Sequence, residues 1–336
     1  MSSSTYSSAM FRLSAVLYSL LPLSVLMYQE KACFHTFWRS GSKDARYQLQ
    51  QHLHAIRASP PATPSPSSLI ESATKGLMER FWTIDQQTKR NMDKILSLYE
   101  EEKVDAASFH GVDGYGHGDI GREKLDVILA KLMGAEEAAV RLQFFSGTHA
   151  IASALFGALR PGDNMVCVSG HPYDTLEEVI GQRDGHQTGS RVGSLQDWGI
   201  GYGEIELLEG EEARKESGDR VAFDLKAIDT AIEKDPQLKL IHIQRSCGYK
   251  WRPSIPVLEI GRLCEHIRRK YKERGRDVII FVDNCYGELV EDIEPCHVGA
   301  DICAGSLIKN LGGTLAPSGL RINSLPTISC SYLYTV

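Results

Sequence analysis

Apolar residues recur along this chain with two different periods, one typical of helices and one typical of buried strands. The longest helical pattern covers residues 69–104, where apolar residues return at steps of three and four and charges fill the other face. A second amphipathic pattern covers residues 255–275 and ends at Gly275. Shorter helical patterns occupy 122–133, 146–159 and 224–234. The sequence thus predicts helices that pack by one apolar face.

Short apolar runs alternate with these helical patterns. In chain order the runs are RLQFF, ending at Phe145, then NMVCV, KLIHIQ and VIIFVD, ending at Asp283. Alternation of strand and helix from 141 to 310 predicts an α/β fold whose mostly parallel sheet is flanked by helices. Residues 182–220, rich in glycine and charge, predict surface structure.

The first 68 residues differ from the rest in composition. Residues 1–66 contain only Glu30 and Asp44 as acids, and the opening forty residues are rich in serine. This composition is typical of an organellar transit peptide of plastid or mitochondrion, with a secretory or a cytoplasmic protein as alternatives. Polar residues and a proline interrupt the apolar run, so a stable membrane span is not favoured. Residues 58–68 have the composition of a disordered linker, and we expect the folded part to begin near Leu69.

Overall composition excludes some classes of protein. With 42% hydrophobic and 24% charged residues, the 336-residue chain is that of a globular protein. A net charge of −6 gives no support for nucleic-acid binding. The eight cysteines show no CxxC spacing, so a disulfide scaffold is not predicted. Cys296 and His297 are adjacent, but no second pair with ligand spacing accompanies them, and we predict no metal site.

The stretch from Asp283 to Gly319 carries the clearest chemistry. Asp283 ends an apolar run, and Lys309 stands between an apolar tripeptide and a Gly-Gly turn. A lysine amine can form a Schiff base with an aromatic aldehyde, and a carboxylate can keep a ring nitrogen protonated. The alternative is structural, with a surface turn aspartate and an exposed lysine.

Three upstream segments could touch a ligand. Ser146, Gly147 and Thr148 precede an alanine-rich helix, where free N–H groups and hydroxyls favour an anion, although a plain helix cap has the same sequence. Tyr173 in HPYDT follows a predicted strand and could stack on a ring or cap the core. Tyr115 lies in a glycine-rich segment that is either a ligand-binding loop or a flexible connection.

Taken together in this order, SGT, HPYDT, DNCYGE and GSLIKNLGG resemble fold-type I pyridoxal-phosphate enzymes. The chain is most similar to the methionine gamma-lyase-like, or aluminium-resistance, branch of the Cys/Met-metabolism family, over residues 70–319. The resemblance implies a fold-type I PLP-dependent transferase large domain over 69–319. It also implies that the small C-terminal domain is missing, with 320–336 as a tail that does not match.

The resemblance implies roles for particular residues. Lys309 matches the Schiff-base lysine and Asp283 the acid that pairs with the pyridine nitrogen. Tyr173 is similar in placement to the aromatic residue that stacks on the cofactor, so Lys309 and Tyr173 are the catalytic candidates.

The phosphate of pyridoxal 5'-phosphate would lie against Ser146, Gly147 and Thr148, with Ser306 supplying a further hydroxyl. Tyr115 resembles a residue that reaches the cofactor of a neighbouring subunit, which implies a homodimer or homotetramer.

The activity implied is that of a carbon–sulfur lyase acting on a small-molecule amino acid: methionine, cystathionine or cysteine. Another type I reaction, such as transamination or aldol cleavage, is an alternative, because the cofactor frame does not select the reaction. A further alternative is an inactive isoform that assembles with a full-length partner. We expect loss of a C-terminal domain to impair stability and activity, because it exposes apolar surface.

Overall fold

The computed structural model describes residues 65–111, 118–183, 192–271, 277–312, 315–316 and 320–324. The chain divides into two compact units, Met1–Met78 and Glu79–Val336. Of the first unit the structure describes only residues 65–78, nearly all within helix α4 (Pro66–Glu101), so the predicted leader lies outside the described residues. None of the helices that the structure describes is long and apolar enough to cross a membrane.

Helix α4 begins inside the stretch that the sequence assigned to a disordered linker. Pro66 is its first residue, and Ser68 donates its hydroxyl proton to the carbonyl of Ser65 (2.9 Å). Proline is well tolerated at the first helical position, because the N–H that it lacks would have no intrahelical partner there. Proline content therefore did not exclude a helix at this point.

The second unit contains the remaining elements. In chain order they are η1 (Ala106–Phe109), α5 (Ile120–Met133), β1 (Glu137–Arg141), α6 (Gly147–Ala158), β2 (Asn164–Cys167), α7 (Asp174–Ile180), β3 (Gly201–Glu204), β4 (Leu208–Glu209), α8 (Gly210–Glu216), β5 (Val221–Ala222), α9 (Leu225–Lys234), β6 (Leu238–Gln244), α10 (Val257–Tyr271), β7 (Ile279–Asp283), η3 (Pro295–Val298), β8 (Ile302–Ser306), η4 (Leu307–Leu311) and β9 (Leu320–Ser324).

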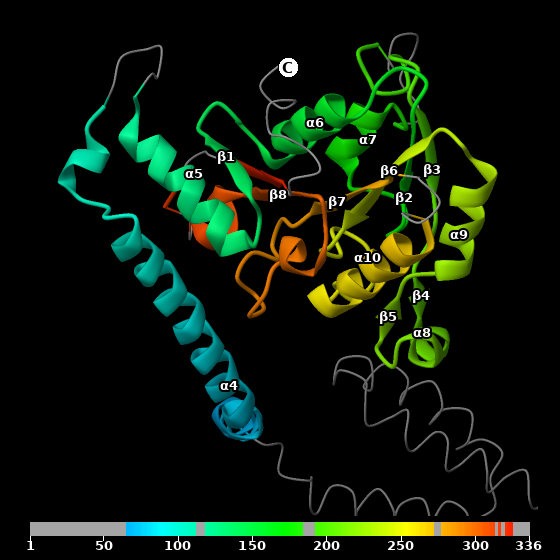
Figure 1. Ribbon diagram of the computed structural model, residues 1–336. Coiled ribbons are helices and arrows are strands. Elements are labelled where there is room, and N and C mark those ends of the chain that lie inside the picture. Colours follow the sequence, from blue (N-terminus) through cyan, green and yellow to red (C-terminus); the bar gives the residue numbers. More distant parts are fainter. Residues whose placement is uncertain are drawn as a thin grey trace, which may run out of the picture. The chain divides into compact units, whose positions relative to one another are not determined.

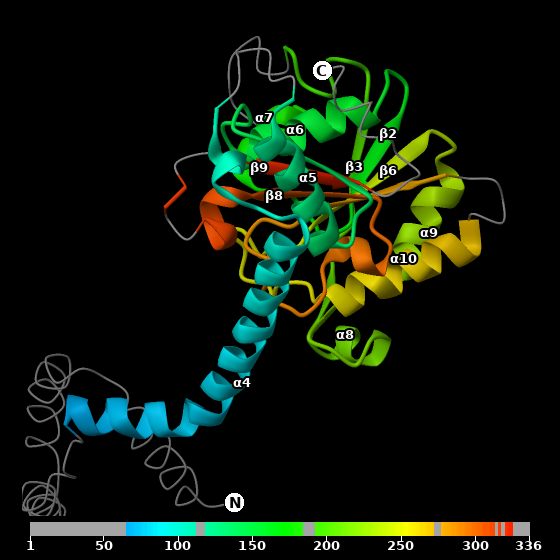
Figure 2. The same ribbon diagram turned by 60° about the vertical axis from the view of Figure 1, so that its left-hand side comes forward.

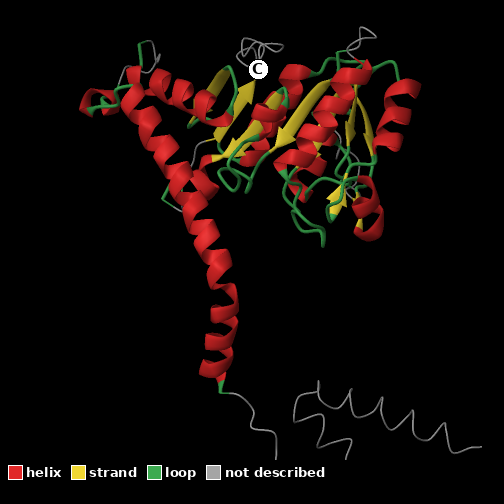
Figure 3. Cartoon of the chain, turned by 60° about the horizontal axis from the view of Figure 1, so that its bottom comes forward, coloured by secondary structure: helices red, strands yellow, loops and turns green. Residues whose placement is uncertain are grey.

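A seven-stranded sheet organises this unit, in the order β1-β9-β8-β7-β6-β2-β3. Strands β8, β7, β6, β2 and β3 are parallel to one another, whereas β9 pairs antiparallel with both β1 and β8. The predicted mostly parallel α/β sheet is confirmed. Figure 3 shows the strands of the sheet with helices on either side.

Helices cover both faces of the sheet because its strands are apolar on both sides. Met165 and Cys167 of β2 pack in a core with Ile151 and Leu155 of α6. The alternate residue Val166 packs in a second core with residues of α9 and α10. Figures 1 and 2 show α6 and α7 on one face, and α9 and α10 on the other. The carboxyl ends of the parallel strands are therefore held at a common edge.

Two predicted segments are corrected. The strand predicted to end at Phe145 ends at Arg141, because the pairing with β9 stops where Arg141 faces Leu320. Residues 182–220, predicted as surface structure, include β3 at one edge of the sheet and the buried side chains of Leu195 and Ile200.

The sheet also extends beyond position 319, where the sequence placed the end of the large domain. Residues 320–324 form β9, which lies between β1 and β8. Ile322 is fully buried in the core beneath α6. Two-sided pairing with distant strands fixes this strand, and its short sequence carries no strong strand pattern of its own.

Strand β9 yields a stability prediction. We expect Ile322→Ala to lower the free energy of unfolding by about 2–5 kcal/mol, since it leaves a cavity in the core. Leu258→Ala, at an exposed position on α10, should change it by less than about 0.5 kcal/mol. Urea unfolding measures both, and equal effects would contradict a central position for β9.

Candidate active site

A cavity of about 390 Å³ lies where several parallel strands end. Its wall is built from the ends of β6 and β7, the first turns of α6 and α7, and the η4 turn after β8. Five of the predicted site residues line it together: Gly147, Thr148, Tyr173, Asp283 and Lys309. The structure thus gathers groups that are far apart in the sequence, although their individual roles stay predictions.

Asp283 presents a buried carboxylate to this cavity. It is the last residue of β7, lies between Gln244 of β6 and Ala304 of β8 in the sheet, and is 3% exposed. Burial raises the pKa of Asp283, while the N–H of Cys285, which donates to Asp283 Oδ1 (3.0 Å), and the nearby Lys309 ammonium oppose that rise. A buried carboxylate of this kind is a site for a cationic or N–H partner.

Lys309 enters the cavity from the η4 turn directly after β8. Its backbone (φ −98°, ψ −119°) departs from helical values within the turn. Its Nζ lies 3.9 Å from the centroid of the Tyr286 ring. The amine is therefore held beside an aromatic face at the cavity wall.

The three residues Ser146, Gly147 and Thr148 at the start of α6 have different positions relative to the cavity. Ser146 is the N-cap, and its hydroxyl accepts a hydrogen bond from the His149 N–H (3.1 Å). Gly147 and Thr148 line the cavity. The Ser146 side chain therefore acts as a helix cap. The N-terminus of α6 faces the cavity, and the N–H groups of its first turn have no intrahelical partners.

Tyr173 and Thr148 meet across this wall. Thr148 Oγ1 lies 3.1 Å from the Tyr173 hydroxyl and 2.7 Å from Thr175 Oγ1. The Tyr173 N–H donates to Gln244 Oε1 (3.0 Å). Burial first, and then the charge of Asp283, raise the pKa of Tyr173, so its hydroxyl stays protonated at neutral pH.

Of the two remaining predicted site residues, the structure describes Ser306 but not Tyr115. Ser306 is fully buried at the end of β8, and its N–H donates to Glu288 Oε1 (2.9 Å). Its hydroxyl oxygen has no hydrogen-bond partner among the described residues. Tyr115 lies outside the described residues.

Eight lining residues are not among the predicted site residues: Asp174, Thr175, Gln244, Ser246, Gly248, Tyr249, Cys285 and Tyr286. Thr175 and Cys285 lie within two residues of predicted ones, so the motifs HPYDT and DNCYGE contained the signal. Gln244 ends a predicted strand, as Asp283 does, and its position at the common edge of the sheet could have marked it.

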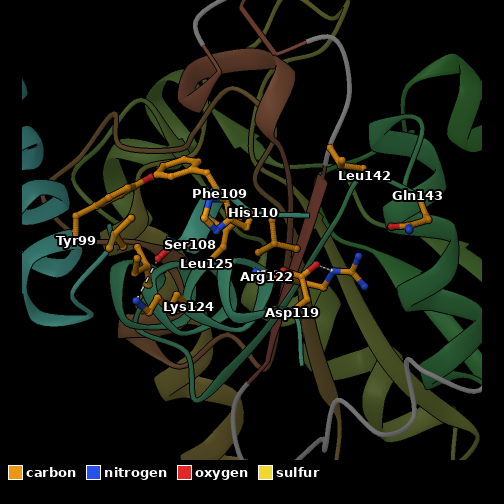
Figure 4. Close-up of a pocket in the computed structure, with 14 residues that line it drawn as sticks. Tyr99, Ser108, Phe109, His110, Asp119, Arg122, Lys124, Leu125, Leu142 and Gln143 are labelled. Carbon is orange, nitrogen blue, oxygen red and sulfur yellow. Dashed lines mark hydrogen bonds and ion pairs between the residues drawn. The ribbon is translucent and has the colours of Figure 1, made fainter. Parts of the chain in front are cut away.

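A second cavity, of about 430 Å³, lies among α4, η1, α5 and the segment after β1 (Figure 4). Its polar groups largely satisfy one another. Lys124 donates to the Lys103 carbonyl and to Ser108 Oγ, and Arg122 pairs with Asp119 (3.4 Å). None of the predicted site residues that the structure describes lines it. We assign the site to the smaller cavity because of its chemistry.

The Cys296–His297 pair has a structural role. His297 Nδ1 accepts a hydrogen bond from the Glu294 N–H (3.1 Å) at the start of η3, and Cys296 is buried. Within the described ranges, no group of three or more histidine, cysteine or acidic residues is placed to hold a metal ion.

Comparison with known proteins agrees with this architecture. The methionine gamma-lyase family profile matches residues 66–326. An uncharacterized protein of Bacillus subtilis, YnbB, is 46% identical over 236 residues, which are 70% of this chain and 51% of that protein.

Two solved structures are also similar. A Clostridium acetobutylicum protein, described as a candidate cystathionine beta-lyase involved in aluminium resistance, is 41% identical with a TM-score of 0.67, over 76% of this chain and 57% of that one. A carbon–sulfur lyase involved in aluminium resistance from Clostridium novyi is 35% identical with a TM-score of 0.67, over 85% and 62%.

These matches confirm the predicted fold class, the large domain of fold-type I enzymes, and extend the match past residue 319. The chain spans about half the length of the B. subtilis relative and about three-fifths of the two solved chains. Since the profile covers most of its length, the chain belongs to the methionine gamma-lyase family.

Proposed function

We propose that this chain binds pyridoxal 5'-phosphate and acts as a carbon–sulfur lyase on a sulfur amino acid: methionine, cystathionine or cysteine. The observation that carries the proposal is the meeting of Lys309, Asp283 and the α6 N-terminus in one cavity. The similarity to a carbon–sulfur lyase supports the reaction class. Assembly as a homodimer or homotetramer and an organellar location stay predictions.

The residues of the cavity fit this cofactor. A phosphate suits the α6 N-terminus, where N–H groups, the helix dipole and the Thr148 hydroxyl converge. Ser306 is fully buried and is not a lining residue of the cavity, but its hydroxyl has no partner among the described residues, which is a state expected of a group that serves a ligand. Lys309 would hold the aldehyde carbon, and Asp283 the pyridine nitrogen.

When bound, pyridoxal phosphate supplies an electron sink for bond breaking at the substrate's α-carbon. The protein supplies charge, position and protons. The Asp283 carboxylate would keep a proton on the ring nitrogen, and its burial would strengthen that interaction. Tyr173 lines the same cavity with its hydroxyl 3.1 Å from Thr148 Oγ1, and its ring would stack on the cofactor.

Lys309 is the group placed to move protons. Once substrate occupies the cavity, its free amine can take the proton from Cα and deliver one toward Cγ or the leaving sulfur. One amine could serve both steps, because Lys309 lines the cavity from a position in η4 whose backbone departs from helical values.

Removal of the Lys309 amine tests the whole proposal. With pyridoxal phosphate added, we expect a visible absorbance band, and borohydride reduction should leave the cofactor on the peptide that contains Lys309. Cystathionine or methionine should yield a keto acid, ammonia and a thiol, and cysteine should yield a keto acid, ammonia and hydrogen sulfide. Lys309→Ala should lose the band and the turnover, because no other amine lines the cavity among the described residues.

Lys226→Ala is the matched control, since Lys226 is exposed on α9 away from the cavity. It should keep the band and the products. A band that survives Lys309→Ala would refute the cofactor assignment. Amino-group transfer in place of keto acid and thiol would replace the lyase by an aminotransferase.

The Ser306→Ala variant tests whether the Ser306 hydroxyl binds a ligand or stabilises the fold. Because Ser306 Oγ has no partner among the described residues, the free energy of unfolding of the cofactor-free chain should stay unchanged or rise by up to about 1 kcal/mol. The dissociation constant of pyridoxal phosphate should rise about tenfold or more, as a charge-assisted hydrogen bond is lost.

Ser169→Ala is the contrasting variant, since Ser169 Oγ accepts a hydrogen bond from the Gln244 N–H (2.9 Å). It should lower stability by about 1–3 kcal/mol, because a buried donor is left unsatisfied. Urea unfolding and cofactor titration measure both. A Ser306→Ala chain with unaltered cofactor affinity would contradict the phosphate role.

Asp283→Asn should change how stability depends on pH in the cofactor-free chain. Burial raises the pKa of folded Asp283, so the folded chain holds its proton at a pH where the unfolded chain has lost it. Wild-type stability then falls as pH rises from about 4 through the raised pKa. The asparagine variant lacks that loss and should be the more stable at neutral pH.

The advantage of Asp283→Asn should vanish below about pH 4, where both states of the wild type are protonated. Asp277→Asn, at an exposed position, should match the wild type throughout. Urea midpoints at several pH values measure the difference, and a constant offset at every pH would contradict a buried ionisable Asp283.

A further inference from the structure

We propose that Tyr286 is a positioning residue for the Lys309 amine, which its ring face holds at the cavity wall. The inference rests on the proposed function, in which Lys309 carries the cofactor and moves protons. Lys309 Nζ lies 3.9 Å from the ring centroid, and both residues line the same cavity.

The ring attracts the amine electrostatically. An ammonium within about 6 Å of an aromatic centroid is drawn to the negative face of the ring. The Tyr286 side chain is 61% exposed, so core packing does not account for its placement. Its ring is available to the cavity and to the lysine.

The backbone of Tyr286 is strained in the conformation that presents the ring. Its φ is +68°, and that of Leu289 is +58°, in a region that residues with a Cβ rarely adopt. Such strain persists where the surroundings enforce it, often at functional sites.

Hydrogen bonds from Arg245 hold the backbone around Tyr286 in this conformation. Arg245 Nη1 donates to Asn284 Oδ1 (2.6 Å) and to the Gly287 carbonyl (2.8 Å). A Cβ on residue 287 would lie 2.4 Å from that nitrogen, so only glycine allows the approach. The residues on both sides of Tyr286 are thus fixed to one buried guanidinium.

Asn310 ties the same loop to the lysine. Its Nδ2 donates to the carbonyls of Tyr286 (3.1 Å) and Glu288 (2.9 Å). Because Asn310 follows Lys309 directly, these bonds set the separation between the backbone that carries the ring and the backbone that carries the amine. The hydrogen bonds of Asn310 therefore keep the Tyr286 ring and the Lys309 amine close to each other.

The Lys309 amine thus has a defined position when it is not bound to the cofactor. A lysine side chain without such a contact samples many rotamers, and ordering it costs entropy. Held at the ring, the amine stays at the wall of the cavity that Asp283 and Thr148 also line, so Tyr286 would act through Lys309 without itself exchanging a proton.

Reductive methylation of the cofactor-free chain with formaldehyde and borohydride tests the contact. The reagent needs the neutral amine, and mass spectrometry follows the Lys309 peptide relative to the exposed Lys226. We expect Tyr286→Leu to speed methylation of Lys309 about two- to fivefold. Tyr286→Phe keeps the ring and should react at the wild-type rate.

Trp251→Leu is the control, as Trp251 is a fully exposed aromatic outside the cavity lining. It should leave the Lys309 rate unchanged. Equal rates in the leucine variant and the wild type would overturn the proposal, and so would a phenylalanine variant that behaves like leucine, because the ring face would then not be responsible.

Prior addition of pyridoxal phosphate separates this inference from the proposed function. Protection of wild-type Lys309 from methylation is expected if the lysine carries the cofactor. Absence of protection would refute the cofactor role alone, since the comparison of leucine with phenylalanine is made without cofactor and stands by itself.

Discussion

A buried guanidinium fixes the part of this protein on which the site depends. Arg245 is 3% exposed and directly follows β6. A charge in that position must be paired and hydrogen-bonded, since an uncompensated buried charge costs several kcal/mol. Its Nε donates to the Ile255 carbonyl (3.3 Å), and both Nη atoms are paired with the segment after β7, through Asn284, Gly287 and Glu291. Satisfying one arginine thus determines the path of the chain that follows Asp283.

Helix α4 holds the same segment from another side. Asn91 is buried, and its Nδ2 donates to the carbonyls of Leu289 (2.9 Å) and Glu291 (3.2 Å). Arg90 pairs with Asp292 (3.0 Å). The sequence predicted α4 only as a packing helix, yet its polar face orders the loop that presents Tyr286. An amphipathic pattern describes the buried apolar face and does not reveal which polar residues bind backbone elsewhere.

The sequence predicted those site residues whose position follows from the sheet. Asp283 ends a strongly apolar run, and Lys309 follows the next strand, so the common edge of parallel strands brings them together. Tyr286 could not be found in this way, because a left-handed backbone at a residue with a Cβ has no sequence signal. Thr148 and Tyr173 were predicted separately, but their contact depends on α6 and α7 packing on one face.

Strand β9 shows why the rest of the fold could not be predicted locally. Its five residues become a strand through pairing with β1, which is far away in sequence, and with β8. In the pairing with β8, Ser306 faces Leu320, so the segment between them, with Lys309 near its start, is closed at both ends by the sheet. A lysine on an open connection would lose its fixed relation to Asp283. The antiparallel pairing therefore anchors both ends of the segment that carries Lys309, at Ser306 and at Leu320.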